Sequence, residues 1–244
     1  MNIRIFSTAL DGTLLGQPES TDRFTRTWTS LERGRRPLLV YNTRRSVANT
    51  LSLVAARQLP EPDYIIGGIG TELYSAYNSL DSGYGDHLQA NWDADTIEHT
   101  IASLQRPRPL PSEVGHRFKS SWIWEGALDA ELKELQRALR EVGISAAINY
   151  SCNYFLDVIP ASAGKGAALA WLCERVRAPL RTALVAGDTG TDLSMFKLES
   201  VRGIIVKNAL PELLDEIRGK PFYFATGSMA DGIAEGLHHF SVIP

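Results

Sequence analysis

Short apolar segments alternate with segments of helical period along most of this chain, and this alternation restricts the fold more than any other feature. The apolar segments, each bounded by glycine or polar turns, are Ile3–Leu10, Pro37–Tyr41, Tyr64–Ile66, Thr182–Ala186 and Gly203–Val206. The segments of helical period are Thr21–Leu31, Ser46–Arg57, Gly164–Arg177, Asp192–Leu198 and Leu210–Arg218. Strands that alternate with helices form parallel sheets covered on both faces. We therefore expect an α/β fold with a doubly wound, parallel-sheet core.

The middle of the chain departs from this alternation. Ser79–Asp95 is polar and rich in turn residues, and the prolines of Arg106–Pro111 exclude a regular helix or a central strand. The patterns that follow predict a strand, a helix and two closely spaced strands, at Arg117–Trp124, Asp129–Val142, Ser145–Tyr150 and Tyr154–Ile159. We expect an α+β domain at residues 81–160, inserted into a core formed by residues 1–80 and 161–244.

Composition restricts the class of partner. The 244 residues are 44% hydrophobic and 22% charged, with a net charge of −3, so the chain has no basic field suited to nucleic acid or anionic lipid. A small molecule is the better partner. The two cysteines, Cys152 and Cys173, form no paired motif, and no leader or membrane-spanning run precedes the first strand. These features favour a cytoplasmic protein.

Polar residues follow the first two apolar segments, where an open parallel sheet binds its ligands. Asp11, Gly12 and Thr13 come after the first, and Thr43 to Ser46 after the second. Asp-Gly alone is also a common turn signal, and Thr43 could simply cap the next helix. Equally, a hydroxyl, a backbone N–H and a helix N-terminus would together hold a phosphate.

The later segments add a cation and two carboxylates. Lys165 lies between Gly164 and Gly166 at a helix start, where a lysine approaches an anion closely, although the spacing is not that of a P-loop. Asp188 and Asp192 flank a short glycine-containing turn after a strand, and such carboxylates suit an oxygen-preferring cation such as Mg²⁺. Together these groups fit phosphoryl transfer, for which a cation, a lysine and a carboxylate are needed.

One component of that chemistry is missing, and its position is specific. An aspartate two residues before Asp11 would place a second carboxylate on the same side of the strand end, because strand side chains alternate. The residue there is Ala9.

The order of these motifs resembles the haloacid dehalogenase superfamily of aspartate-dependent phosphotransferases. The segments that resemble its sucrose-phosphatase group are Tyr41–Ser46, Gly68–Glu72, Phe118–Trp122, Asp157–Pro160 followed by Lys165-Gly166, and Val206–Ala209. The segments at Lys119–Trp122 and Lys165–Cys173 look most like the mannosylfructose-phosphate phosphatase branch of that group.

The resemblance implies a set of catalytic roles. Position 9 should carry the aspartate that attacks phosphorus, and Asp11 should protonate the leaving sugar oxygen and then activate water. Thr43 and Lys165 would bind the phosphoryl oxygens. A Mg²⁺ cofactor would be held by the carboxylate at position 9, the main-chain carbonyl of Asp11 and Asp188, with Asp192 nearby.

The resemblance also implies a substrate and the residues that bind it. The inserted domain would be a cap that confers specificity for a phosphorylated disaccharide, mannosylfructose 6-phosphate or sucrose 6-phosphate. Besides Thr43 and Lys165, the residues expected to bind this substrate are Arg44, Glu72, Lys119, Asn153 and Asn208.

Ala9 leaves three interpretations open. The chain is an engineered, substrate-trapping variant, a natural non-catalytic relative, or an enzyme in which another carboxylate attacks. We favour the first, because the other catalytic positions are intact and Asp11 points toward the leaving group. The alternative function is a phosphosugar-binding regulatory protein that associates with a glycosyltransferase. On either of the first two interpretations the chain hydrolyses little or nothing.

Overall fold

The computed structural model describes residues 2–76, 82–90, 92–110 and 116–244, which form two compact units. The first unit comprises Met1–Asp81 and Lys165–Pro244, and the second comprises Ser82–Gly164. No helix in the described ranges is long and apolar enough to cross a membrane.

A seven-stranded sheet forms the centre of the first unit, in the order β11-β10-β9-β1-β2-β3-β4. All neighbouring strands are parallel except β3 and β4, which are antiparallel. The strands are β1 (Ile5–Thr8), β2 (Leu38–Asn42), β3 (Tyr64–Gly67), β4 (Glu72–Ser75), β9 (Ala183–Gly187), β10 (Arg202–Ile205) and β11 (Tyr223–Phe224). The parallel, helix-connected core expected from the alternation of segments is confirmed.

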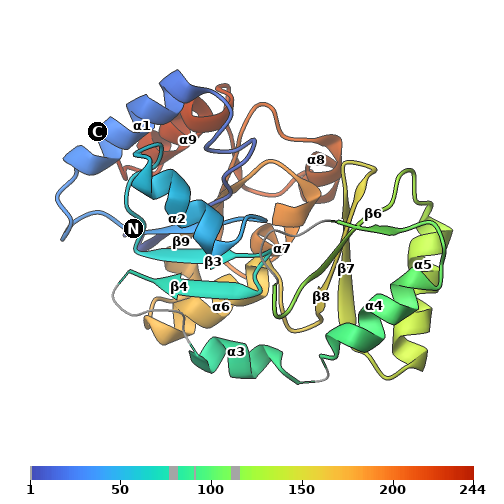
Figure 1. Cartoon of the computed structure of the whole chain (residues 1–244). Coiled ribbons are helices and arrows are strands. Elements are labelled where there is room, and N and C mark those ends of the chain that lie inside the picture. Colours follow the sequence, from blue (N-terminus) through green and yellow to red (C-terminus); the bar gives the residue numbers. More distant parts are fainter. Residues whose placement is uncertain (1, 77–81, 91, 111–115) are drawn as a thin grey trace. The chain divides into compact units, whose positions relative to one another are not determined.

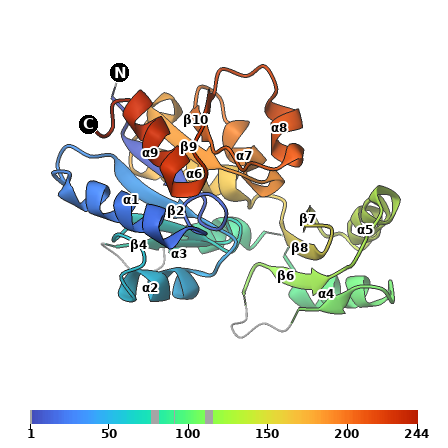
Figure 2. The ribbon, with the colours of Figure 1, turned by 90° about the horizontal axis from the view of Figure 1, so that it is seen from above.

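Helices cover both faces of this sheet, with α1 and α9 on one face and α6 on the other (Figure 1). The helices are α1 (Pro18–Ser30), α2 (Val47–Ala55), α6 (Lys165–Arg175), α7 (Leu193–Phe196), α8 (Pro211–Ile217) and α9 (Met229–His239). Figure 2 shows α1 beside α9, with which it is in contact. Phe6, Trp28 and Ile233 belong to the buried core, to which β1, α1 and α9 contribute.

Strand order determines where a site can form. The chain passes from β1 to β2 and β3 on one side, and later from β9 to β10 and β11 on the other. The order therefore reverses between β1 and β9, whose carboxyl ends lie side by side. Open α/β sheets bind ligands at such a switch point.

The second unit contains a four-stranded antiparallel sheet in the order β5-β6-β8-β7. Its strands are β5 (Arg108–Pro109), β6 (Ser120–Ile123), β7 (Ala146–Ser151) and β8 (Phe155–Pro160). Its helices are α3 (Ser82–Leu88), α4 (Ala94–Ala102) and α5 (Asp129–Glu141). Proline restricts β5 to an edge, which agrees with the exclusion of a central strand there.

Two parts of the expected pattern need correction. Ser79–Asp95, expected to be irregular, contains helix α3, although residues 79–81 and 91 lie outside the described ranges. Helix α4 also begins in this segment. Asp93 caps it by accepting a hydrogen bond from the Thr96 amide. A polar stretch can thus form helices when it supplies a cap and a few apolar contacts such as Tyr84 and Leu88, both buried in α3.

Candidate active site

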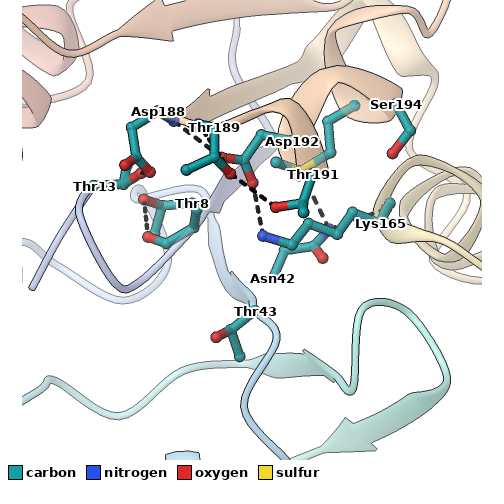
Figure 3. Close-up of polar contacts among 12 residues, drawn as sticks. Thr8, Thr13, Asn42, Thr43, Lys165, Asp188, Thr189, Thr191, Asp192 and Ser194 are labelled. Carbon is teal, nitrogen blue, oxygen red and sulfur yellow. Dashed lines mark hydrogen bonds and ion pairs between the residues drawn. The ribbon is translucent and has the colours of Figure 1, made fainter. Parts of the chain in front are cut away.

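The expected site residues of the first unit lie on the loops that follow β1, β2, β9 and β10, at the start of β4 and at the start of α6. Asp188, Thr13, Asp192 and Lys165 gather at the ends of β1 and β9, and Thr43 lies on the neighbouring loop (Figure 3). This is the edge of the sheet at which the strand order reverses.

Asp192 and Lys165 form a buried ion pair. Lys165 Nζ lies 2.7 Å from Asp192 Oδ1, and the two side chains are 4% and 1% exposed. The other carboxylate oxygen of Asp192 accepts hydrogen bonds from the amides of Asp188 and Thr189, at 2.9 and 3.1 Å. Asp192 therefore organises the turn after β9 and holds the ammonium group of Lys165 at the same time.

Asp188 carries the strongest electrostatic perturbation of the site. Burial raises the pKa of its carboxyl from an ordinary value of 3.8 to about 6, and the Asp192 carboxylate adds to this rise. The Thr13 hydroxyl donates a hydrogen bond to Asp188 Oδ1 at 2.5 Å and, with Lys165, opposes the rise. A buried carboxylate in this state is a good ligand for a cation, because a cation compensates the charge that burial disfavours.

Gly12 is required where the first loop passes Asp188. It has a φ of +76°, and a Cβ atom built on it would lie 2.2 Å from Asp188 Oδ2. Its carbonyl accepts a hydrogen bond from the Asn208 amide group at 2.7 Å. The loop after β1 is thus held closely against the ends of β9 and β10.

Ala9 follows β1 directly, at the same edge of the sheet. It is 3% exposed, and its amide donates to the Ala186 carbonyl of β9 at 3.0 Å. Its methyl group offers neither an attacking oxygen nor a metal ligand. In the described ranges, no group of three or more His, Cys, Asp or Glu side chains could hold a metal ion. The donors present fit Mg²⁺ only in part, because Asp188 supplies a buried carboxylate where position 9 supplies none.

Asp11 is more exposed than Asp188, and its carboxylate pairs with Arg45. Its two carboxylate oxygens accept hydrogen bonds from Arg45 Nη2 and Nε, at 2.6 and 2.8 Å. Thr43 is 2% exposed, and its hydroxyl oxygen accepts a hydrogen bond from the Arg45 amide at 3.1 Å. The neighbouring Arg44 is partly buried.

Two residues expected to read sugar hydroxyls, Glu72 and Asn208, have main-chain hydrogen-bond partners in the first unit. Glu72 Oε2 accepts a hydrogen bond from the Val47 amide at 2.6 Å. Asn208 donates to Gly12 and accepts from the Met229 amide at 2.9 Å. Both side chains therefore connect loops of the first unit.

The other two, Lys119 and Asn153, belong to the second unit, and the structure does not bring them together. Lys119 directly precedes β6, whose first residue pairs with Val158. Asn153 lies in the β7–β8 turn, beside the end of β8 that pairs with the last residue of β6. It has a φ of +51°, and its Oδ1 accepts a hydrogen bond from the Tyr150 hydroxyl at 3.3 Å. The two residues thus lie at opposite ends of the sheet.

Three further residues contribute to the site, although none of them was assigned a role of its own from the sequence. They are Arg45 beside Asp11, Thr13 beside Asp188, and Asn42, whose amide group donates to the Lys165 carbonyl at 3.0 Å. Thr13 and Arg45 lie within two residues of Asp11 and Thr43, and this closeness in the sequence could have identified them. Asn42 is the last residue of β2 and is fully buried, and it lies in the family-like segment Tyr41–Ser46.

The switch-point sheet and the acidic, lysine-containing site at its carboxyl edge define a haloacid dehalogenase-like α/β protein. A family model described as sucrose-6F-phosphate phosphohydrolase matches residues 2–241. The chain belongs to this family, and its relatives are phosphoric monoester hydrolases.

Individual relatives agree with this assignment. The chain is 41% identical to mannosylfructose-phosphate phosphatase of Agrobacterium fabrum, over 99% of this chain and 98% of that protein. It is 31% identical to probable sucrose-phosphatase 3b of Arabidopsis thaliana, over 91% of this chain but 55% of that longer protein. The crystal structure of sucrose-phosphatase from Synechocystis sp. PCC6803, in complex with sucrose and phosphate, matches with a TM-score of 0.89 at 28% identity and 99% coverage of both chains.

Proposed function

We propose that this chain is a form of disaccharide-phosphate phosphatase that binds its substrate without turning it over. The substrate class is mannosylfructose 6-phosphate or sucrose 6-phosphate, for which the names of the relatives are the support. The observation that carries the proposal is the organised acidic site at the end of β9, where Asp188 and the Lys165–Asp192 pair are buried, whereas Ala9 at the end of the neighbouring β1 cannot attack. Buried charges are costly to keep, and a bound ligand would offset part of that cost at Asp188, whose pKa is raised by burial.

With aspartate at position 9, the reaction has two steps. The position 9 carboxylate attacks phosphorus, the bond from phosphorus to the sugar oxygen breaks, and Asp11 gives that oxygen a proton. Asp11 then takes a proton from water, which attacks the aspartyl-phosphate and releases inorganic phosphate. Thr43 and Lys165 bind the phosphoryl oxygens throughout, with Arg44 beside them on the loop.

The methyl group of Ala9 has no lone pair, so the first of these steps has no nucleophile. Asp11 is a poor substitute, because its carboxylate is held by Arg45. Loss of an attacking residue that acts within a catalytic unit costs a factor of about 10⁶ in turnover. Turnover by the present chain is therefore expected to be close to zero.

Mg²⁺ is the cofactor that this site would use. Asp188 and the main-chain carbonyl of Asp11 would hold it, with Asp192 nearby. When bound, the ion neutralises charge on the phosphoryl oxygens. With Ala9 the ion loses one ligand, whereas the substrate loses a repulsive carboxylate. Affinity for Mg²⁺ should fall, and affinity for the phosphosugar should hold or rise.

The second unit is the proposed cap, and Lys119 and Asn153 are its candidate sugar-binding residues. They lie at opposite ends of one sheet. The names of the relatives, and not this spacing, support a disaccharide phosphate as the substrate class.

Restoring the nucleophile tests the proposal. The Ala9→Asp protein should release phosphate from sucrose 6-phosphate or mannosylfructose 6-phosphate in a Mg²⁺-dependent reaction, with a higher kcat/KM than for glucose 6-phosphate. Ala9→Asn, which has the same shape but no carboxylate, is the matched control and should stay inactive. Equal kcat/KM values for the hexose and disaccharide phosphates would refute the disaccharide assignment.

Ala9 itself favours a second candidate, a phosphosugar-binding regulatory protein that associates with a glycosyltransferase. An Ala9→Asp protein that binds the disaccharide phosphate but releases no phosphate would support this alternative. Calorimetry on the unaltered chain decides whether either holds. No heat of binding at millimolar disaccharide phosphate, with and without Mg²⁺, would exclude both.

A further inference from the structure

The loop between β3 and β4 contains three successive residues in the left-handed region. The φ angles of Gly68, Ile69 and Gly70 are 57°, 60° and 83°. For Ile69, which is β-branched and 1% exposed, this backbone conformation is costly. Such a conformation persists only where the surrounding structure compensates for it, and it often serves a site.

The strained loop holds the loop after β2. The Ile69 amide donates to the Thr43 carbonyl at 3.0 Å, and the Gly68 amide donates to the Arg45 carbonyl at 2.8 Å. The Thr43 amide in turn donates to the Ile66 carbonyl of β3 at 2.9 Å. Both main-chain polar groups of Thr43 are therefore bonded to residues 66–69.

Glu72 completes this attachment. Its Oε2 accepts from the amide of Val47, the first residue of α2, and Ser46 Oγ accepts from the Asn49 amide at 3.1 Å. A carboxylate at a helix N-terminus is favoured by the unpaired amides and by the helix dipole. The N-terminus of α2 already carries an anion of the protein.

Gly67 allows the approach. A Cβ atom on it would lie 2.9 Å from both Glu72 Oε2 and the Val47 nitrogen, and 3.1 Å from the Arg45 carbonyl oxygen. No real Cβ atom tolerates such contacts with main-chain atoms on two sides. The glycine-rich sequence before Glu72 is thus explained by close packing against the Thr43–Val47 segment.

We propose that Glu72 is a positioning residue, which fixes Thr43 for the phosphoryl group by anchoring the start of α2. The proposal rests on the proposed function, because Thr43 acts there on phosphate. It replaces the expectation that Glu72 acts by reading sugar hydroxyls. Phosphate is then bound by Thr43 and Lys165, and not by the N-terminus of α2.

Hydrogen exchange on the free chain tests the anchoring without any ligand. In Glu72→Ala, amides of residues 43–49 should exchange about tenfold faster or more, as expected for loss of a hydrogen bond to a charged group. Glu72→Gln should restore slow exchange, because its amide oxygen can still accept from Val47. Glu61→Ala is the control, since Glu61 is 78% exposed and pairs only with Arg33 among the ion pairs of the described residues. Unchanged exchange at residues 43–49 in Glu72→Ala would overturn the proposal.

Ligand binding separates positioning from sugar recognition. Calorimetry should compare inorganic phosphate with sucrose 6-phosphate on the unaltered chain and on each variant. A positioning residue predicts that Glu72→Ala weakens both ligands by the same factor, about tenfold, and that Glu72→Gln stays within about threefold. Loss of affinity for sucrose 6-phosphate alone would show that Glu72 reads the sugar, and the proposal would be wrong.

The two proposals can fail separately. If the unaltered chain binds neither ligand, the proposed function fails, whereas the exchange experiment still decides the role of Glu72. Should Glu72→Ala not fold, Glu72→Asp takes its place, because it keeps the charge but shortens the reach by one methylene. The expected increase in exchange is the same.

Discussion

Arg45 holds both carboxylate oxygens of Asp11, with Nη2 at 2.6 Å from Oδ1 and Nε at 2.8 Å from Oδ2. This hydrogen bonding raises the pKa of the Arg45 guanidinium above its ordinary value. A bidentate pair fixes the direction of a carboxylate as well as its distance. It connects the loop after β1 to the loop after β2, so the proposed acid and the proposed phosphate-binding loop are oriented together.

The first prediction concerns this pair and uses the Ala9→Asp protein. Arg45→Ala should lower kcat for sucrose 6-phosphate by about ten- to a hundredfold, because Asp11 loses the partner that directs it toward the leaving oxygen. Hydrolysis of p-nitrophenyl phosphate should fall less than threefold, since that leaving group departs without a proton. Arg23→Ala is the control, because Arg23 Nη2 donates to both carboxylate oxygens of Asp231 in an ion pair that is also partly exposed. Equal losses on both substrates would show that Arg45 acts on the phosphoryl group.

Sequence patterns predicted the core because its strands are short, apolar and separated by helices of ordinary composition. They did not predict α9, although it packs on the sheet, because Gly232 and Gly236 lower its helix propensity. The reason for these glycines is tertiary. A Cβ on Gly236 would lie 2.5 Å from Ile204 Cγ1 of β10, so the helix needs glycine to approach the sheet.

Contacts that form only in the folded chain also limited what the sequence could predict about the site. The residue types at positions 11, 43, 165, 188 and 192 indicated phosphoryl chemistry, because their order along the chain follows the strand ends. The partners of Glu72 and Asn208 could not be predicted, because each bonds main-chain atoms of a different loop, 25 and 196 residues away. A polar side chain that supports a loop and one that binds a sugar look alike until the fold brings the loops together.

The second prediction concerns the charge of Asp188. Asp188→Asn should raise the metal-free free energy of unfolding at neutral pH by roughly 1–3 kcal/mol, because it removes a buried carboxylate whose pKa is raised to about 6 and keeps an oxygen for Thr13. Millimolar Mg²⁺ should stabilise the unaltered chain but not the variant. Urea unfolding with EDTA and with Mg²⁺ measures both effects. Equal stabilisation of the two proteins by Mg²⁺ would place the metal elsewhere.

The third prediction is a loss of stability in acid that originates at Glu235. The Tyr223 hydroxyl and the amides of Thr226 and Gly227 donate to its carboxylate and lower its pKa from 4.5 to about 2. A depressed pKa stabilises the fold above the unfolded value, and this contribution disappears as the pH falls from about 4.5 to about 2.

Glu235→Gln tests the assignment. After allowance for solvent screening, the contribution of the charge should be on the order of 1–2 kcal/mol, so the variant should be less stable at neutral pH. The difference between the two proteins should shrink toward pH 2. Urea unfolding at a series of pH values measures it, with the exposed Glu61→Gln as control. A difference that stays constant with pH would mean that the charge of Glu235 contributes nothing.

The last prediction concerns the packing that holds Lys165 against Asp192. Gly166 follows Lys165 at the start of α6, and its amide donates to Ser194 Oγ at 3.0 Å. A Cβ atom on Gly166 would lie 2.2 Å from the Ser194 carbonyl oxygen and 2.6 Å from its carbonyl carbon. Main-chain atoms cannot turn aside as a side chain can, so Gly166→Ala must move α6 away from the turn that carries Asp192.

Alanine normally favours a helix over glycine by about 0.5–1 kcal/mol. Here overpacking should outweigh that gain, and Gly166→Ala should lower the free energy of unfolding by about 1–3 kcal/mol. Because the Lys165–Asp192 pair is buried, the same shift should weaken binding of inorganic phosphate. Gly34→Ala is the control, since a Cβ there has no atom within 4 Å, and its stability should change by less than about 1 kcal/mol. A Gly166→Ala protein as stable as Gly34→Ala would show that α6 can move freely against Ser194, and that the close approach does not hold Lys165 in place.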